Sequence, residues 1–293
     1  MTDFIAAPSV RALALQRGID LKTLAQDLGR TTIAREDLER PSRATAPSGE
    51  NSYWEVDHAA FGPVAEEPTS RFARAAAANL AAANAMIPQV THHDRADITA
   101  LEGFRRTLKT EAQERNIKLT ALAFHIKALA RALRAFPRFN ASLSPDGKTL
   151  VLKDYVHVGI AVDTAHGLMV PVLRDVDRAG LWQIAGEISD LAARAQDRRI
   201  GPEEMGGASM TVSSLGGIGG TGFTPIVNPP EVAILGISRT ETATLWQGDT
   251  PRPVPMLPLD LSYDHRVING ADAARFMRYL CGLLEDPRRI MVG

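Results

Sequence analysis

Hydrophobic residues recur along the chain with two spacings, one typical of helices and one typical of strands. The clearest helical spacing predicts an amphipathic helix over 120–136 that Pro137 ends, with an apolar face of Leu122, Ile126, Leu129, Leu133 and Phe136. Further predicted helices are an Ala-rich one capped by Thr69 or Ser70 and ended by Pro88, one from Thr99 to about Asn116, and two over 181–197 and 271–284. Strands are predicted over 89–98, 156–162, 169–172, 210–215, 232–237 and 257–263. Because strands and helices do not alternate strictly, the pattern favours an α+β layered fold.

The first 56 residues differ in pattern from the rest. Residues 4–40 show three short helical patterns separated by Gly18 and Gly29. A unit of this size without disulfides lies near the lower limit for independent folding, so tight helix packing and capping must stabilise it. Residues 41–56, PSRATAPSGENSYWEV, have the composition of a linker. Residues 57–293 are then predicted to form one continuous domain.

Charge balance and cysteine count exclude several classes of protein. The 33 Lys and Arg against 34 Asp and Glu give a net charge of -1, so no nucleic-acid partner is expected. The single cysteine, Cys281, excludes an internal disulfide framework and a Cys-based zinc site, and its apolar neighbours predict a small core residue. The N-terminus lacks a secretory signal pattern, and no apolar run reaches the ~18 residues of a membrane span. A cytoplasmic protein without a membrane partner is expected.

Two motifs suggest chemistry that their surroundings argue against. The glycines at 217–222 satisfy the GxGxxG pattern of dinucleotide sites, but three prolines within 223–230 forbid the helix that this fingerprint must open. The His-His pair at 92–93 could suggest a metal, yet adjacent strand residues point to opposite faces, so no metal is expected. His125 and His157 lie in apolar periodic segments and are predicted to be structural.

The most informative segment runs from Leu261 to Gly270 and reads LSYDHRVING. A predicted strand ends in an Asp-His-Arg triplet, which is followed by a predicted turn at Asn269 and then by a helix. His265 therefore stands at a strand end between charged residues, where an imidazole can act as a base at neutral pH. From the residues alone, the alternative is a local ion pair of the flanking Asp and Arg.

Four long motifs, in this order, resemble the dihydrolipoamide acyltransferases of 2-oxo acid dehydrogenase complexes, most closely the acetyltransferases of bacterial pyruvate dehydrogenase. They are IPQVTHHDRADIT at 87–99, KDYVHVGIAVDTAHGLMVPVLRDVD at 153–177, TVSSLGGIGGTGFTPIVNPPEVAILGI at 211–237 and SYDHRVINGA at 262–271. The last is similar to the family's active-site signature. Residues 4–40 resemble the peripheral subunit-binding domain that docks partner enzymes. The resemblance covers nearly the whole chain.

The resemblance implies an α+β fold like that of chloramphenicol acetyltransferase, preceded by a small all-helical domain. It implies homotrimers, packed in proteobacterial relatives into a hollow core that usually holds 24 subunits. Each active site would lie between subunits, with coenzyme A and the lipoyl arm entering one channel from opposite ends. The module at 4–40 would dock dihydrolipoamide dehydrogenase, the 2-oxo acid decarboxylase, or both.

The implied reaction moves an acetyl group from dihydrolipoyl-lysine to coenzyme A by direct thiol attack. An imidazole of pKa about 6.5 can remove the proton of a thiol of pKa ~8.5 in the transition state, and His265 is the expected base. Ser213 matches the family serine that donates a hydrogen bond to the tetrahedral oxyanion, from a different subunit than the histidine. Losing such a donor costs on the order of 10²–10³ in rate. Asn269, the third expected catalytic residue, stands where the family commonly has Asp, and some relatives carry Asn there.

By the same resemblance, Asp163 and Tyr263 would line the lipoyl side of the channel. Arg71, Arg105 and Phe223 would contact coenzyme A, the arginines as phosphate partners. The usual lipoylation motif needs an Asp-Lys pair, and none occurs in the sequence. The lipoyl group is therefore expected in trans, on another chain, or in a segment that this sequence omits. Two other functions stay open: a noncatalytic docking scaffold, and an acetyltransferase for another small acceptor.

Overall fold

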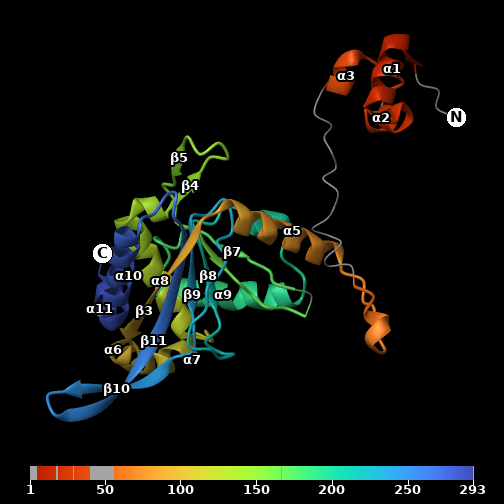
Figure 1. Ribbon diagram of the computed structural model, residues 1–293. Helices are drawn as coiled ribbons and strands as arrows, with labels where there is room; N and C mark the ends of the chain where they lie inside the picture. The colour runs from red at the N-terminus through yellow and green to blue at the C-terminus, as the bar shows by residue number, and fades with distance from the viewer. Residues whose placement is uncertain (1–4, 18, 29, 40–55, 166, 293) are drawn as a thin grey trace. The chain divides into compact units, whose positions relative to one another are not determined.

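The computed structural model describes residues 5–17, 19–28, 30–39, 56–165 and 167–292 (Figure 1). Contacts within the chain divide it into two units, Met1–Pro68 and Thr69–Gly293. Gly18, Gly29 and nearly all of the predicted linker at 41–56 lie outside the described residues.

The first unit has a small hydrophobic core between three short helices. Its elements are β1 (Ile5–Ala6), α1 (Pro8–Gln16), α2 (Leu21–Asp27), β2 (Thr32–Ile33), α3 (Arg35–Glu39) and the 3-10 helix η1 (His58–Phe61). The buried core side chains are Val10, Ala14, Leu21, Ile33 and Leu38. Asp37 fixes the start of α3, because its carboxylate accepts from the backbone N–H of Ala34 at 2.8 Å and binds Arg30 at 2.6 Å. The predicted helices are present, with one addition, the parallel pair β1 and β2.

A mixed seven-stranded sheet organises the second unit. Its strands are β3 (Gln89–Asp97), β6 (Val158–Ile160), β7 (Val172–Leu173), β8 (Met210–Ser214), β9 (Ala233–Ile237), β10 (Glu241–Gln247) and β11 (Thr250–Asp264). The first half of β11 pairs with β10, and its second half pairs with β3 on one side and β9 on the other. From β9 the order continues through β8 and β6 to β7, and β8 is parallel to both of its neighbours. A separate hairpin joins β4 (Ala141–Leu143) and β5 (Leu150–Leu152).

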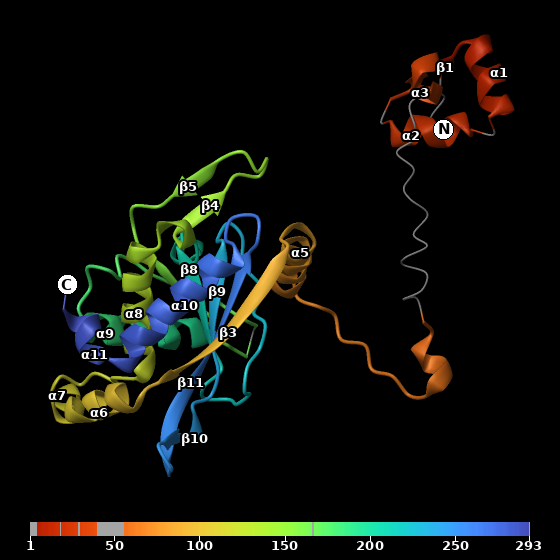
Figure 2. The ribbon, with the colours of Figure 1, turned by 60° about the vertical axis from the view of Figure 1, so that its left-hand side comes forward.

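Helices cover one face of this sheet and enclose the main core. They are α6 (Thr99–Thr107), α7 (Lys109–Glu114), α8 (Ala121–Ala135), α9 (Leu181–Gln196), α10 (Gly270–Glu285) and α11 (Pro287–Met291). Figure 2 shows α8, α9, α10 and α11 on one side of the sheet and α5 (Arg71–Met86) on the other. Leu259 and Leu261 of β11 belong to the main core. Side chains alternate along a strand, so Asp260 and Ser262 face away from the main core.

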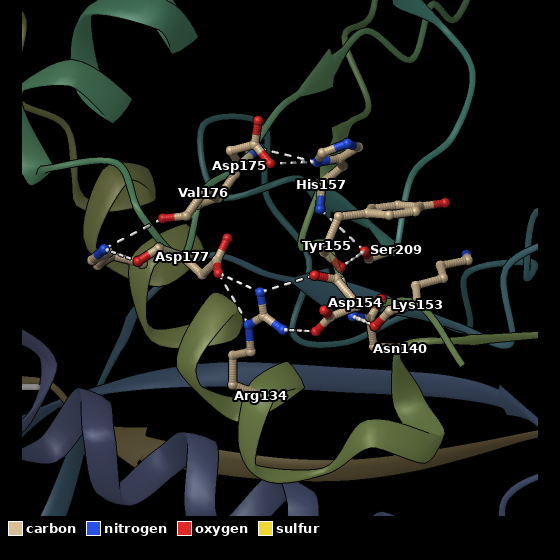
Figure 3. A network of polar contacts seen from close by, with 11 residues as sticks. Arg134, Asn140, Lys153, Asp154, Tyr155, His157, Asp175, Val176, Asp177 and Ser209 are labelled. Atoms are coloured by element: carbon tan, nitrogen blue, oxygen red, sulfur yellow. Dashed lines mark hydrogen bonds and ion pairs between the residues drawn. The ribbon is translucent and has the colours of Figure 1, made fainter. Parts of the chain in front are cut away.

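A polar network ties α8 to the strands at the edge of the sheet (Figure 3). Arg134 donates to the carboxylates of Asp177 at 2.7 Å and Asp154 at 3.1 Å. His157 accepts a hydrogen bond at Nδ1 from the backbone N–H of Asp175 at 3.0 Å. These contacts give His157 the structural role that its apolar surroundings predict.

Three predictions about elements need correction. The helix predicted from Thr99 to about 116 divides at Leu108 into α6 and α7. Thr99, which the sequence suggests as the cap of this helix, is instead its first helical residue; Ile98 is the N-cap, and the Asp97 carboxylate before it accepts from the backbone N–H of Thr99 at 2.9 Å. The strand predicted from 257 begins at Thr250, and β10, β4 and β5 were not predicted.

The early part of β11 escaped prediction because it contains prolines, which normally argue against a strand. Pro251, Pro253 and Pro255 occupy alternate positions, so their nitrogens all point to the same side. The carbonyl of Pro255 accepts from Ile98 beyond the end of β3, whereas β10 pairs on the opposite side of β11. The missing N–H donors therefore face an edge that has no partner strand among the described residues.

Candidate functional site

His265 follows β11 directly, on a loop held by its two neighbours. The buried carboxylate of Asp264 accepts from the Arg266 guanidinium at 2.7 Å and from its backbone N–H at 2.9 Å. The backbone N–H of His265 donates to the carbonyl of Pro88 at 3.1 Å. The local ion pair, which was the alternative interpretation of these flanking residues, is therefore present, and it holds the loop that carries the exposed imidazole of His265.

Asn269 begins the helix that follows this loop. Its side-chain oxygen accepts from the backbone N–H of Asp272 at 2.8 Å, so Asn269 is the N-cap of α10. The expected turn at this position is thus a helix start. The cap orients α10 relative to the loop of His265, which lies four positions earlier.

Ser213 lies near the end of β8 and is half-buried. It is level with Gly236 on the parallel strand β9. Residues 215–230 contain no helix, which supports the rejection of a dinucleotide site. The ring of Phe223 packs against Gly236. A Cβ atom added at Gly236 would lie only 2.9 Å from the Cζ atom of this ring. Only a glycine lets this ring pack against β9 beside Ser213.

The strand register keeps Ser213 and His265 apart within one chain. Ser213 is level with Gly236, which in turn is level with Asp260 of β11. His265 lies five residues further along the chain, or about 17 Å along the sheet at the usual rise per residue. A single chain does not bring the two expected catalytic groups to one reacting carbonyl.

The residues expected around coenzyme A lie on different sides of the sheet. Arg71 is the exposed first residue of α5. Arg105 lies on α6, where Glu102 accepts from its guanidinium at 2.7 Å and holds the pKa of Arg105 above its ordinary value. Arg105 also lines a hollow of about 350 Å³ together with two further basic residues, Arg106 and Lys109. Within one chain, Arg105 lies on the face opposite to Phe223.

The two residues expected on the lipoyl side are also separated. Tyr263 is 2% exposed and belongs to the main core, and its ring centroid lies 5.9 Å from that of His265. Burial raises the pKa of Tyr263 above its ordinary value. Asp163 is exposed after β6, which β9 and β8 separate from β11 in the sheet. Tyr263 therefore packs beside the imidazole, whereas Asp163 lies at the surface, beyond the two intervening strands.

Two buried carboxyl groups were missed at the sequence level. Asp260 binds His93 on β3 at 2.6 Å and also accepts from the backbone N–H of Phe223 at 3.1 Å. Glu231 accepts from the hydroxyl of Thr211 at 2.9 Å, and burial raises the pKa of Glu231 to about 7. Asp260 stands between Leu259 and Leu261, and this alternation indicates that the sheet has a second, polar face. The His-His pattern at 92–93 suggests only a metal ligand and gives no sign that His93 pairs with Asp260.

The described part of the chain holds neither a metal-binding group of side chains nor a helix suited to span a membrane. Across these residues, no group of three or more His, Cys, Asp or Glu side chains is placed to hold a metal ion. No described helix combines the length and the apolar character needed to cross a bilayer.

Comparison with known proteins identifies what this fold and these motifs resemble. The family model for the 2-oxoacid dehydrogenases acyltransferase (catalytic domain) matches residues 62–292. The dihydrolipoyllysine-residue acetyltransferase component of the pyruvate dehydrogenase complex of Pseudomonas aeruginosa is 46% identical over 299 residues, 98% of this chain and 55% of that protein. The same component of Azotobacter vinelandii is 45% identical, over 98% of this chain and 47% of that protein. The chain spans about half the length of the curated relatives it matches.

Two solved structures share the fold closely. The cubic core of the pyruvate dehydrogenase multienzyme complex is 50% identical and covers 81% of this chain and 98% of that chain, with a TM-score of 0.79. Azotobacter vinelandii dihydrolipoamide acetyltransferase, studied for the role of a serine, a histidine and an asparagine in its mechanism, is 49% identical with the same coverage and TM-score. The predicted α+β class, a mixed sheet with packed helices, is confirmed.

Proposed function

Because the chain belongs to the 2-oxoacid dehydrogenase acyltransferase family, we propose that it transfers an acetyl group between dihydrolipoyl-lysine and coenzyme A. One observation carries this proposal above the others. Ser213, His265 and Asn269 are separated by the same intervals as the serine, histidine and asparagine studied in the Azotobacter vinelandii enzyme. The fold presents the first at a strand end, the second on an exposed loop and the third as a helix cap.

The proposed mechanism needs no acyl-enzyme. His265 removes the proton of the coenzyme A thiol as the sulfur attacks the carbonyl carbon of the acetyl thioester. The Ser213 hydroxyl donates a hydrogen bond to the oxyanion of the tetrahedral intermediate. The bond between carbon and the lipoyl sulfur then breaks, and that sulfur takes the proton back from His265.

We propose that this site forms between two copies of the chain, within a homotrimer. The separation of about 17 Å along the sheet prevents Ser213 and His265 of one chain from meeting. The exposed loop of His265 is free to face the β8 end of a second copy. The likeness to a cubic core supports a further assembly of trimers, with 24 subunits as the proposed number.

The substrates would reach this interface from two sides. We assign Phe223, Arg71 and Arg105 to coenzyme A, and Asp163 and Tyr263 to the lipoyl side. Phe223 carries the strongest support, because its ring packs beside Ser213. The lipoyl group would come from outside these 293 residues, either in trans on another chain or from a segment that this sequence omits, since no Asp-Lys pair occurs here.

The domain organisation follows from the same proposal. Residues 4–40 would dock dihydrolipoamide dehydrogenase or the 2-oxo acid decarboxylase, 41–56 would be a linker, and 57–293 would be the acyltransferase domain. A bacterial pyruvate dehydrogenase complex in the cytoplasm is the proposed setting. The first unit supports this division, because it has a hydrophobic core of its own.

Thioester exchange between acetyl-coenzyme A and free dihydrolipoamide tests the catalytic proposal. Wild type should form acetyl-dihydrolipoamide, and His265→Ala should lose this activity by about 10²–10⁴-fold. His58→Ala, at an exposed histidine of the first unit, is the matched control and should leave the rate unchanged. A wild-type protein without exchange would reject the proposal in favour of the noncatalytic scaffold or of an acetyltransferase for another small acceptor.

Docking is tested separately by size-exclusion chromatography. Deletion of residues 1–40 should abolish co-elution with dihydrolipoamide dehydrogenase and with the decarboxylase. Exchange with free dihydrolipoamide should persist, because the deleted unit holds none of the proposed catalytic residues. Unchanged co-elution would reject residues 4–40 as the docking module.

A further inference from the structure

A second imidazole lies on the polar face of the sheet, held by a buried carboxylate. His93 Nδ1 lies 2.6 Å from Asp260 Oδ1, and the two residues are directly opposite each other on β3 and β11. The Asp260 side chain is 3% exposed, whereas the His93 side chain is 57% exposed. The carboxylate thus fixes the ring, and the rest of the imidazole reaches solvent.

This pair belongs to a row that ends at Ser213. Asp260 is level with Gly236, and Gly236 is level with Ser213, so the row crosses β3, β11, β9 and β8. Residues paired across neighbouring strands point to the same face, and three interstrand spacings separate His93 from Ser213 by about 14 Å.

Phe223 fills the middle of this row. Its ring packs on Gly236, and its backbone N–H donates to the second oxygen of Asp260 at 3.1 Å. The same carboxylate therefore positions two groups, the phenyl ring beside Ser213 and the imidazole of His93.

We propose that His93 is a binding residue for coenzyme A, whose pantetheine arm runs from Ser213 across Phe223 to the imidazole. This inference rests on the proposed acetyl transfer. A carboxylate can only accept, so a hydrogen bond between the Asp260 carboxylate and His93 Nδ1 requires the ring proton to be on Nδ1. In the neutral ring Nε2 is then an acceptor, which suits an amide N–H of the pantetheine arm. The ring of Phe223 would pack against the methylene groups between the amides.

Titration calorimetry on the full-length chain tests this assignment. His93→Asn keeps a nitrogen near the place of Nδ1 for Asp260 but removes the reach of Nε2. It should weaken the Kd for coenzyme A about tenfold, with the KM for dihydrolipoamide and the unfolding midpoint unchanged. His93→Gln, whose amide reaches the place of Nε2, should recover part of the affinity.

The control is His92→Asn, because His92 lies on the opposite face of the same strand and should not alter the Kd for coenzyme A. A wild-type Kd in His93→Asn would overturn the inference and leave the pair with a purely structural role. Pantetheine alone should show the same fold-loss as coenzyme A. A loss seen only with coenzyme A would place the contact at the nucleotide and reject the pantetheine assignment. Absence of coenzyme A binding and of exchange in wild type would refute the proposed function itself.

Discussion

Buried titratable residues couple the stability of this chain to pH. Glu231 is 5% exposed, and one of its carboxylate oxygens has no hydrogen-bond partner within the described residues. Burial raises its pKa from 4.5 to about 7. Between these two values the unfolded chain releases a proton that the folded chain keeps. The contribution of Glu231 to stability therefore falls as pH rises, by about 3 kcal/mol once the pH exceeds 7.

Glu231→Gln should remove this dependence, because an amide does not titrate. Relative to wild type, the unfolding free energy of the variant should increase as the pH rises from 4.5 to 7. Urea unfolding at pH 5 and pH 8 measures it, with the exposed Glu114→Gln as control. Equal differences at the two pH values would show that Glu231 is ionised in the folded chain.

His125 acts in the opposite direction. Burial lowers its pKa from 6.5 to about 4, so its contribution to stability is present above pH 6.5 and is lost as pH falls toward 4. The two groups oppose each other between pH 4.5 and pH 6.5. Wild-type stability should therefore vary less across this range than that of Glu231→Gln, as urea unfolding of both proteins at pH 5 and pH 6.5 would measure.

Comparing variants of Ser213 and of its neighbour Ser214 distinguishes an oxyanion role of Ser213 from a role in folding. Ser213→Ala should lower kcat for thioester exchange on the order of 10²–10³-fold and leave the unfolding midpoint unchanged. Ser214→Ala is the matched control, since successive strand residues point to opposite faces and Ser214 is exposed. Equal activities of both variants and wild type would contradict the role assigned to Ser213.

At the scale of elements, Asn269 joins helix stability to the site. Asn269→Ala removes the cap of α10 and should lower the unfolding free energy by about 1 kcal/mol. Asn269→Asp keeps an acceptor oxygen at the helix N-terminus, where negative charge is favourable, and should match or exceed wild-type stability. Chemical unfolding of the two variants beside wild type measures both effects. A destabilised Asp variant would mean that the amide nitrogen of Asn269 has a partner of its own.

Local patterns predicted the elements that have strong periodicity or clear stop signals. The apolar spacing gave α8 within one residue at each end, and Ser70 caps α5 as expected. The prolines of β11 argued against a strand at its start. They are tolerated because β3 ends before it reaches them, and the sequence alone does not show where β3 ends relative to β11. Long-range register also decides the site: His93 and Asp260 are 167 positions apart, and no local pattern pairs them. The same register separates Ser213 from His265.

At the scale of the whole molecule, the division of the site between copies can be tested by complementation. Ser213→Ala and His265→Ala should each be inactive alone. When the two are co-expressed in equal amounts and assemble randomly, about one quarter of the interfaces pair an intact serine with an intact histidine. Co-expressed chains should thus recover about a quarter of the wild-type exchange rate. Activity no greater than that of the two separate variants would place both groups in one chain.

The distance between Ser213 and His265 along the sheet would make catalysis depend on encounter between chains as well as on folding. If the site forms between copies as proposed, a newly made chain would reach its native fold with only half of each reacting centre and would leave thioesters untouched until a second copy arrives. Specific activity would then fall on dilution while the circular dichroism spectrum stays constant. Acetyl transfer would in this way be confined to finished assemblies, where docked partner enzymes can supply and use the acyl group.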